Sequence, residues 1–172
     1  IALSFVACDN PNEKEIVEVE ALIAKANVTE NSLLSLDTSK IFGTKRQLQK
    51  DLAELSKIGD TLTKDEAFKV SDYFGSKKKF YRLATRYPKF INQIETSKKQ
   101  LNDLKQDLEN GLLNKENYAT YYSVEQAALL DLDIQVNKLI TGIDVVVGKY
   151  ESDRPDLLIL IEKLKQKSAV ND

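Results

Sequence analysis

Two apolar stripes, mirrored about a short turn, constrain the fold of this chain more than any other feature. In residues 80–108 and again in residues 118–150, apolar side chains recur at alternating steps of three and four. This spacing places the side chains of each run along one side of a helix, in a heptad seam. The first seam comprises Phe80, Leu83, Tyr87, Phe90, Ile94, Ser97, Leu101, Leu104 and Leu108. The second comprises Tyr118, Tyr122, Glu125, Leu129, Leu132, Val136, Leu139, Ile143, Val146 and Tyr150.

The residues between the two seams predict a tight connection. Gly111 suits the end of the first helix and Asn114 suits the cap of the second. Reflection about this turn pairs residues whose numbers sum to about 226, so that Ile94 faces Leu132. The sequence therefore predicts an antiparallel helical hairpin over residues 76–152. Pro88 falls inside the first arm, where we expect a kink or a short break because proline removes a backbone hydrogen bond.

Shorter helices are predicted on either side of this hairpin. Residues 11–26 form one, capped by Asn10, and residues 29–58 form a second helical region with a capping box at Thr44 and a stop at Gly59. Thr63 opens a further segment with another capping box. After Pro155, residues 154–167 are apolar on nearly all sides, so we expect them to be fully buried.

The predicted fold is all-α, with a long antiparallel helical hairpin packed with shorter helices into a bundle. Only 6 Gly and 3 Pro occur in 172 residues, which is too little turn chemistry for a sandwich or a barrel. We expect residues 11–172 to form a single domain.

The composition also limits the chemistry. The chain contains no His and one Cys, which excludes thiolate zinc clusters, His-ligated metal sites and the usual catalytic triads. Asp103 and Asp107 lie one helical turn apart, but nothing else converges on them, so we interpret them as solvated surface charges. We therefore predict no catalytic residue, no metal and no cofactor, and a protein that is not an enzyme.

The first residues change abruptly from apolar to polar at Cys8. The segment from Leu3 to Cys8, Leu-Ser-Phe-Val-Ala-Cys, resembles the lipobox of bacterial lipoproteins. The resemblance implies that residues 1–7 are the remnant of a signal peptide, that Cys8 carries acyl chains, and that residues 8–10 are a lipidated tether. It also implies a location in the bacterial cell envelope, anchored to the membrane. The alternative is that residues 1–7 form a short buried strand or helix start. We expect the tether at the end of the molecule away from the hairpin turn.

Two groups of residues are candidates for contact with a partner. Residues 73–94 contain six cations and no acid, interleaved with aromatic side chains. These cations suit anionic lipid or polysaccharide, and less readily nucleic acid, which an exported protein rarely meets. The alternative is that the aromatic rings are core and the cations are solvated or ion-paired. The six cations are Lys77, Lys78, Lys79, Arg82, Arg86 and Lys89. The second group, near the hairpin turn, is Tyr118, Tyr121 and Tyr122, which suit an unknown protein partner or a wet core.

The function expected from these features is that of a lipid-anchored cell-envelope protein acting as a non-catalytic interaction or scaffold module. The alternative is a soluble module that binds anionic lipid, polysaccharide or nucleic acid through residues 77–89. No small-molecule substrate is evident.

Overall fold

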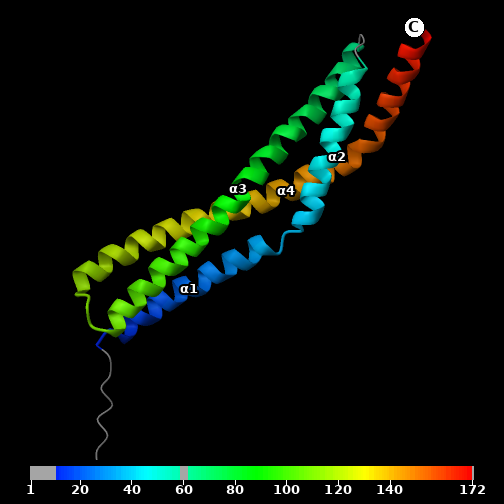
Figure 1. Cartoon of the computed structure of the whole chain (residues 1–172). Coiled ribbons are helices and arrows are strands. Elements are labelled where there is room, and N and C mark those ends of the chain that lie inside the picture. Colours follow the sequence, from blue (N-terminus) through cyan, green and yellow to red (C-terminus); the bar gives the residue numbers. More distant parts are fainter. Residues whose placement is uncertain (1–10, 59–61, 172) are drawn as a thin grey trace, which may run out of the picture. The chain divides into compact units, whose positions relative to one another are not determined.

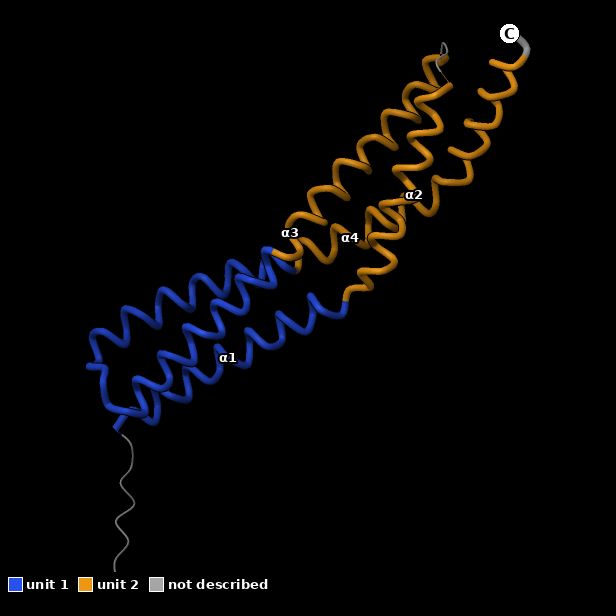
Figure 2. The backbone as a smooth tube through the Cα atoms, in the orientation of Figure 1, with its two compact units in different colours: residues 1–35, 89–136 blue, residues 36–88, 137–172 orange. Residues whose placement is uncertain are grey.

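Four α-helices make up the computed structural model, which describes residues 11–58 and 62–171 (Figure 1). They are α1 (Glu13–Leu34), α2 (Thr38–Lys57), α3 (Lys64–Glu109) and α4 (Lys115–Asn171). No strand occurs in the described residues, which confirms the all-α prediction. Contacts within the chain fall into two compact units (Figure 2). Unit 1 contains residues 1–35 and 89–136, and unit 2 contains residues 36–88 and 137–172.

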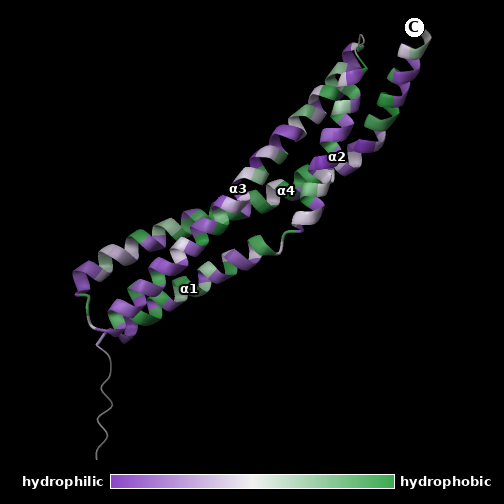
Figure 3. Ribbon diagram, viewed as in Figure 1, coloured by the Kyte–Doolittle hydropathy of each residue, from purple (hydrophilic) through white to green (hydrophobic). Residues whose placement is uncertain are grey.

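Unit 1 is a bundle of three helical segments. α1 runs antiparallel to the last part of α3, because Lys105 contacts Glu20 at 2.6 Å and Lys98 contacts Glu30 at 2.7 Å. α1 runs parallel to the first part of α4, where Lys25 contacts Asp133 at 2.8 Å. Apolar stripes from all three segments form the core, and hydrophobic and hydrophilic residues alternate along each helix (Figure 3). The buried residues are Val19, Leu22, Ala26, Leu101, Leu104, Leu108, Tyr118 and Leu129.

Unit 2 is also built from three helical segments, namely α2, the first part of α3 and the last part of α4. The α3 and α4 segments are antiparallel, since the Tyr73 hydroxyl donates to the Asp153 carbonyl at 2.6 Å and Lys163 contacts Glu66 at 2.8 Å. α2 is linked to α4 by Asp51, which accepts a hydrogen bond from Tyr150. The edge of the Phe80 ring meets the Tyr150 ring, with the centroids 6.5 Å apart.

Both units confirm the predicted register of the hairpin. In unit 1, Gln93 and Leu132 line the same shallow depression as Ser97 and Ala128, and each pair sums to 225. In unit 2, Tyr73 and Asp153 are hydrogen-bonded and sum to 226. The mirrored seams thus identify the correct pairing of α3 with α4.

Three of the predicted caps are present. At the start of α3 the Thr63 backbone N–H donates to the Glu66 carboxylate at 2.9 Å, and the Glu66 N–H lies 3.4 Å from the Thr63 hydroxyl. At the end of α3, Gly111 has a φ of +66°, which lets the Leu112 N–H reach the Asp107 carbonyl at 2.9 Å. The Asn114 side chain then accepts from the Asn117 N–H at 2.8 Å and starts α4.

The capping box predicted at Thr44 is wrong, because this residue lies inside α2. Asp37 caps that helix instead, its carboxylate accepting from the Lys40 N–H at 2.8 Å. The first helix extends to Leu34, eight residues beyond the predicted end. The predicted cap Asn10 and the predicted stop Gly59 lie outside the described residues.

The two prolines do not interrupt the long helices. α3 continues through Pro88 and α4 continues through Pro155, so the arms extend well past the predicted limits 76 and 152. Proline costs a helix about 3 kcal/mol, and the buried side chains on both sides of each proline outweigh this cost. The prediction that residues 154–167 are buried all round is also wrong. Leu157 is buried, whereas Ile159 on the opposite side is 67% exposed.

The start of α1 lies beside the α3–α4 turn. The Asn12 side-chain amide donates to the Leu108 carbonyl at 2.9 Å. The predicted tether, residues 8–10, lies outside the described residues, but Asn12, which follows it closely in the chain, lies beside the turn and not away from it.

Candidate functional site

Part of the predicted basic stretch forms an exposed stripe on α3. Lys78, Arg82 and Arg86 follow each other at steps of four, which puts them on one side of the helix, and all three are exposed. Lys79 is exposed beside them, and Lys77 is half-buried with its ammonium 5.9 Å from the Phe74 ring centre. The sixth predicted cation, Lys89, is exposed but belongs to unit 1.

A second set of cations reaches this stripe from α2. The Lys45 ammonium lies 4.3 Å above the centre of the Tyr81 ring, and the Gln49 amide donates to the Tyr81 hydroxyl at 2.5 Å. These contacts place residues 45–50 of α2 alongside the basic part of α3. Arg46 and Lys50, one turn apart, are exposed there. We call the six residues together the basic face: Lys45, Arg46, Lys50, Lys78, Arg82 and Arg86.

The contribution of α2 was missed from the sequence. Residues 38–50 contain four cations and no acid, which is the same signal that marked residues 73–94. That run is shorter, and without the fold nothing indicated that the two runs are neighbours. A search for acid-free segments on both partners of a helix pair would have found it.

The positive charge of the basic face is not compensated within the part of the chain that the structure describes, because none of the six cations forms an ion pair there. Other cations of unit 2 are paired: Lys40 with Glu151 at 3.1 Å and Lys149 with Asp72 at 2.7 Å. Because the cations of the basic face have no acidic partner while other cations of unit 2 do, the basic face is a positively charged surface that suits an anionic partner.

The aromatic side chains of the basic stretch divide between core and surface. Phe80 and Phe90 are buried, as expected for seam residues. Tyr81 and Phe74 are 43% and 46% exposed, and Phe68 is 66% exposed near the start of α3. Exposed rings next to cations are typical of surfaces that meet a membrane interface.

The tyrosine cluster near the turn is mostly part of the core of unit 1. Tyr118 is buried, and its hydroxyl donates to Glu18 of α1 at 2.7 Å. Burial, together with this bond to a carboxylate, raises the pKa of Tyr118. The Tyr122 ring packs against it at 5.4 Å, and only Tyr121 is largely exposed. Tyr118 therefore offers no surface to a partner. Glu125, which lies in the same seam, is half-buried, and burial raises its pKa.

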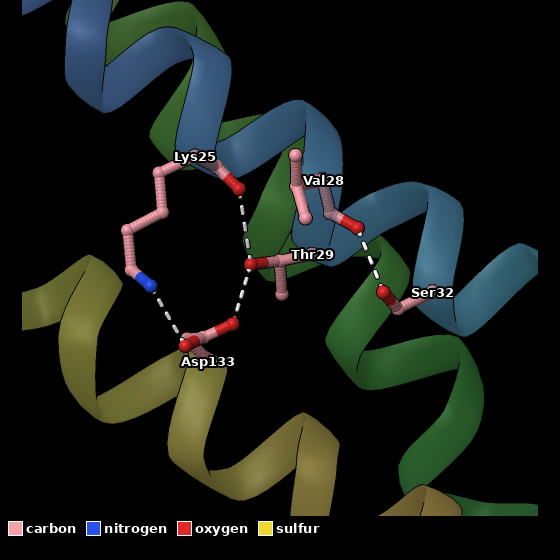
Figure 4. Close-up of polar contacts among 5 residues, drawn as sticks. All are labelled: Lys25, Val28, Thr29, Ser32 and Asp133. Carbon is pink, nitrogen blue, oxygen red and sulfur yellow. Dashed lines mark hydrogen bonds and ion pairs between the residues drawn. The ribbon is translucent and has the colours of Figure 1, made fainter.

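Polar groups inside each unit join its helices to one another. In unit 1 the Thr29 hydroxyl lies 2.8 Å from one Asp133 oxygen and 3.1 Å from the Lys25 carbonyl, and the Lys25 ammonium contacts the other Asp133 oxygen at 2.8 Å (Figure 4). Asp51 has the same role in unit 2. These contacts are explained by helix packing.

Within residues 11–58 and 62–171, no group of three or more His, Cys, Asp or Glu side chains could hold a metal ion. No described helix is both long enough and apolar enough to cross a membrane. Cys8, the predicted lipidation site, lies outside the described residues. In comparisons with known proteins, no family model, no curated protein and no solved structure matches the chain.

Proposed function

We propose that this chain is a non-catalytic interaction module of the bacterial cell envelope, tethered by lipid at Cys8, which binds anionic lipid headgroups through the basic face. The observation that carries the binding activity is the exposed, unpaired charge contributed jointly by α2 and α3. The tether rests on the lipobox resemblance at Leu3 to Cys8.

The size of the expected interaction supports this partner class. Each Lys or Arg close to an anionic membrane surface contributes about 1 kcal/mol. Six such residues, with the exposed rings of Tyr81 and Phe74 beside them, are sufficient for reversible binding to a charged bilayer. Arg and Lys stems also cover apolar surface while their charged ends stay in water, as an interfacial location requires.

The basic face is tested by removing its central stripe. The variant Lys78→Gln, Arg82→Gln, Arg86→Gln loses three of the six cations, so we expect about a hundredfold weaker partition onto phosphatidylglycerol-containing vesicles. The measurement uses vesicle flotation of protein that also carries Cys8→Ser, so that acylation does not contribute. Binding to purely zwitterionic vesicles should be weak for both proteins.

A matched control separates the basic face from net charge. The variant Lys69→Gln, Lys99→Gln, Lys138→Gln changes the total charge equally at three exposed positions that do not belong to this face. Its partition should stay close to that of the unaltered protein. Equal losses in both variants would show that only net charge matters. Binding to nucleic acid or an acidic polysaccharide without binding to vesicles would overturn the choice of lipid.

The tether is tested in the bacterial cell. Cys8→Ser should leave the helical domain folded and move it from the membrane fraction to the soluble fraction, because acyl chains provide the anchor. Mass spectrometry of the unaltered protein should show acyl groups on Cys8. A Cys8→Ser protein that still sediments with membranes, after a wash in high salt to remove electrostatic binding, contradicts the tether.

A further inference from the structure

The end of unit 1 that carries the α3–α4 turn also carries the start of α1. The side chain of Asn12 is bonded to the Leu108 carbonyl at 2.9 Å, and Tyr118, one turn into α4, is bonded to Glu18 at 2.7 Å. The first described residues are therefore held next to the turn by contacts to both long helices.

Only three residues lie between Cys8 and Asn12, so the two are four residue steps apart. Whatever its conformation, a chain of this length spans at most about 14 Å, since an extended residue covers about 3.5 Å. An acylated Cys8 is held at the bilayer surface. The turn end of unit 1 must then stay close to that surface, whereas the other end of α1, at Leu34, lies about 32 Å further along a helix of 22 residues.

The turn carries one apolar side chain that is largely exposed to solvent and is not part of the core. Leu112 is 70% exposed, more than any other large hydrophobic side chain among the described residues. In a helix cap of this type the residue at this position usually packs against the helix, but the facing positions here are Asp107 and Gln106. Its neighbour Leu113 does pack against the core of unit 1. The cap explains Gly111, and the core explains Leu113, but neither explains a leucine at position 112.

We propose that the α3–α4 turn of unit 1 is a membrane-contact surface, with Leu112 entering the interfacial region of the bilayer that holds the acyl chains of Cys8. This inference rests on the proposed tether. The nearby carboxylates of Glu109 and Glu116 are exposed and stay in the aqueous layer, so the contact is shallow. It is distinct from the basic face, because it needs no anionic lipid.

The chain contains no Trp, so a single introduced Trp reports on one position. We compare Leu112→Trp with Leu34→Trp, a matched control in which an exposed leucine of the same unit lies at the far end of α1. Each acylated protein is purified from bacterial membranes and placed in zwitterionic vesicles, with or without bromine on the lipid acyl chains. Bromine quenches Trp only at short range.

The Leu112→Trp emission should fall about twofold in brominated vesicles, as expected for a side chain at the acyl boundary, and the Leu34→Trp emission should not change. If Leu112→Trp fails to fold, Val17→Trp replaces it, because Val17 is exposed and lies four residues after the start of α1. Its emission should be quenched less than expected for position 112 and more than at position 34. Equal quenching at positions 112 and 34, or none at either, in an acylated protein overturns this inference alone. A protein without acyl groups on Cys8 overturns both the tether and the inference.

Discussion

The Asp51 carboxylate accepts hydrogen bonds from three side chains of unit 2, and these bonds give a quantitative prediction for stability. It accepts from the Tyr150 hydroxyl at 2.5 Å, from the Arg154 Nε at 2.9 Å and from the Gln47 amide at 2.8 Å. Asp51 is only 5% exposed, and Tyr150 is equally buried. Three donors therefore replace the water that this carboxylate loses on folding.

Tyr150→Phe removes one of these donors, together with the contact between the hydroxyl and Arg154, and leaves the ring packed against Phe80. A hydrogen bond to a charged acceptor contributes about 1.5–3 kcal/mol, so the free energy of unfolding should fall by that amount. Asp51→Ala should cost more, about 3–5 kcal/mol, because it removes the charge partner of Arg154 and also leaves the Tyr150 hydroxyl buried without an acceptor. Urea titration followed by far-UV circular dichroism measures both changes. The double variant should cost clearly less than the sum of the two single changes.

The same group predicts a pH dependence. Burial by itself raises the pKa of Asp51, but the hydrogen bonds from Tyr150, Arg154 and Gln47 outweigh it, and the pKa lies below its ordinary value of 3.8. A lowered folded-state pKa adds stability above pH 3.8 that is lost as the pH falls below it. The stability difference between the unaltered protein and Asp51→Asn should therefore narrow on acidification. If the free energy of unfolding of Tyr150→Phe lies within about 0.5 kcal/mol of that of the unaltered protein, the hydrogen bonds to Asp51 do not stabilise unit 2 as expected.

Four further substitutions test other parts of the fold by urea titration. Gly111→Ala should lower the free energy of unfolding by about 1 kcal/mol, because Gly111 has a positive φ that alanine adopts only with strain. Gly148→Ala should raise it by about as much, because Gly148 lies inside a helix with open space around the added methyl group. If both substitutions changed the free energy of unfolding in the same direction, the helix cap at Gly111 would be contradicted. Leu101→Ala should cost about 2–5 kcal/mol because the side chain is fully buried, and a smaller loss would mean that the core of unit 1 is loosely packed. The hydrogen bond from Lys163, with those from Thr63, lowers the pKa of Glu66 to about 2. The destabilisation by Glu66→Gln should therefore be complete above pH 4.5 and disappear as the pH falls toward 2. A stability difference between the two proteins that does not change with pH would contradict the ion pair between Lys163 and Glu66.

The parts of the fold that the sequence predicts correctly are those with a local or periodic signal. The two seams identify the hairpin and its register because every buried position on one arm requires an apolar partner on the other. Gly111 and Asn114 identify the turn because only a few residue types adopt these backbone conformations or cap a helix. Thr63 and Glu66 form a capping box for the same local reason.

The errors arise where tertiary contacts outweigh local preference. Pro88 predicts a kink or a short break and Pro155 predicts the start of a separate segment. Neither a break nor a separate segment is present, because each proline is flanked by buried residues on both sides and the helices continue. The sequence leaves open whether Tyr118 faces a partner or lies in a core that tolerates water, because a two-helix tip has no third helix. Residues 13–34 provide that third helix, and Glu18 provides the acceptor for the Tyr118 hydroxyl. Nothing in the linear pattern indicated that α1 begins beside the turn.

Removing charge from the basic face should change stability and membrane binding in opposite directions. Lys78, Arg82 and Arg86 are neighbours at steps of four, so two like-charged pairs repel each other, each by about 0.2–0.5 kcal/mol. Gln has nearly the same helix propensity as Lys and Arg. The triple change to Gln should therefore raise the free energy of unfolding by about 0.4–1 kcal/mol in low salt, and the gain should disappear in high salt, where the repulsion is screened.

If these cations served the fold, the triple variant would instead be less stable, because contacts that hold unit 2 together would be lost. A variant that is more stable in urea and weaker in vesicle flotation indicates that the three charges are kept at a cost to folding. Since no ion pair within the described residues offsets that cost, the compensating negative charge then belongs to a partner. A variant that is less stable at every salt concentration would assign the stripe to the fold and contradict the proposed binding surface.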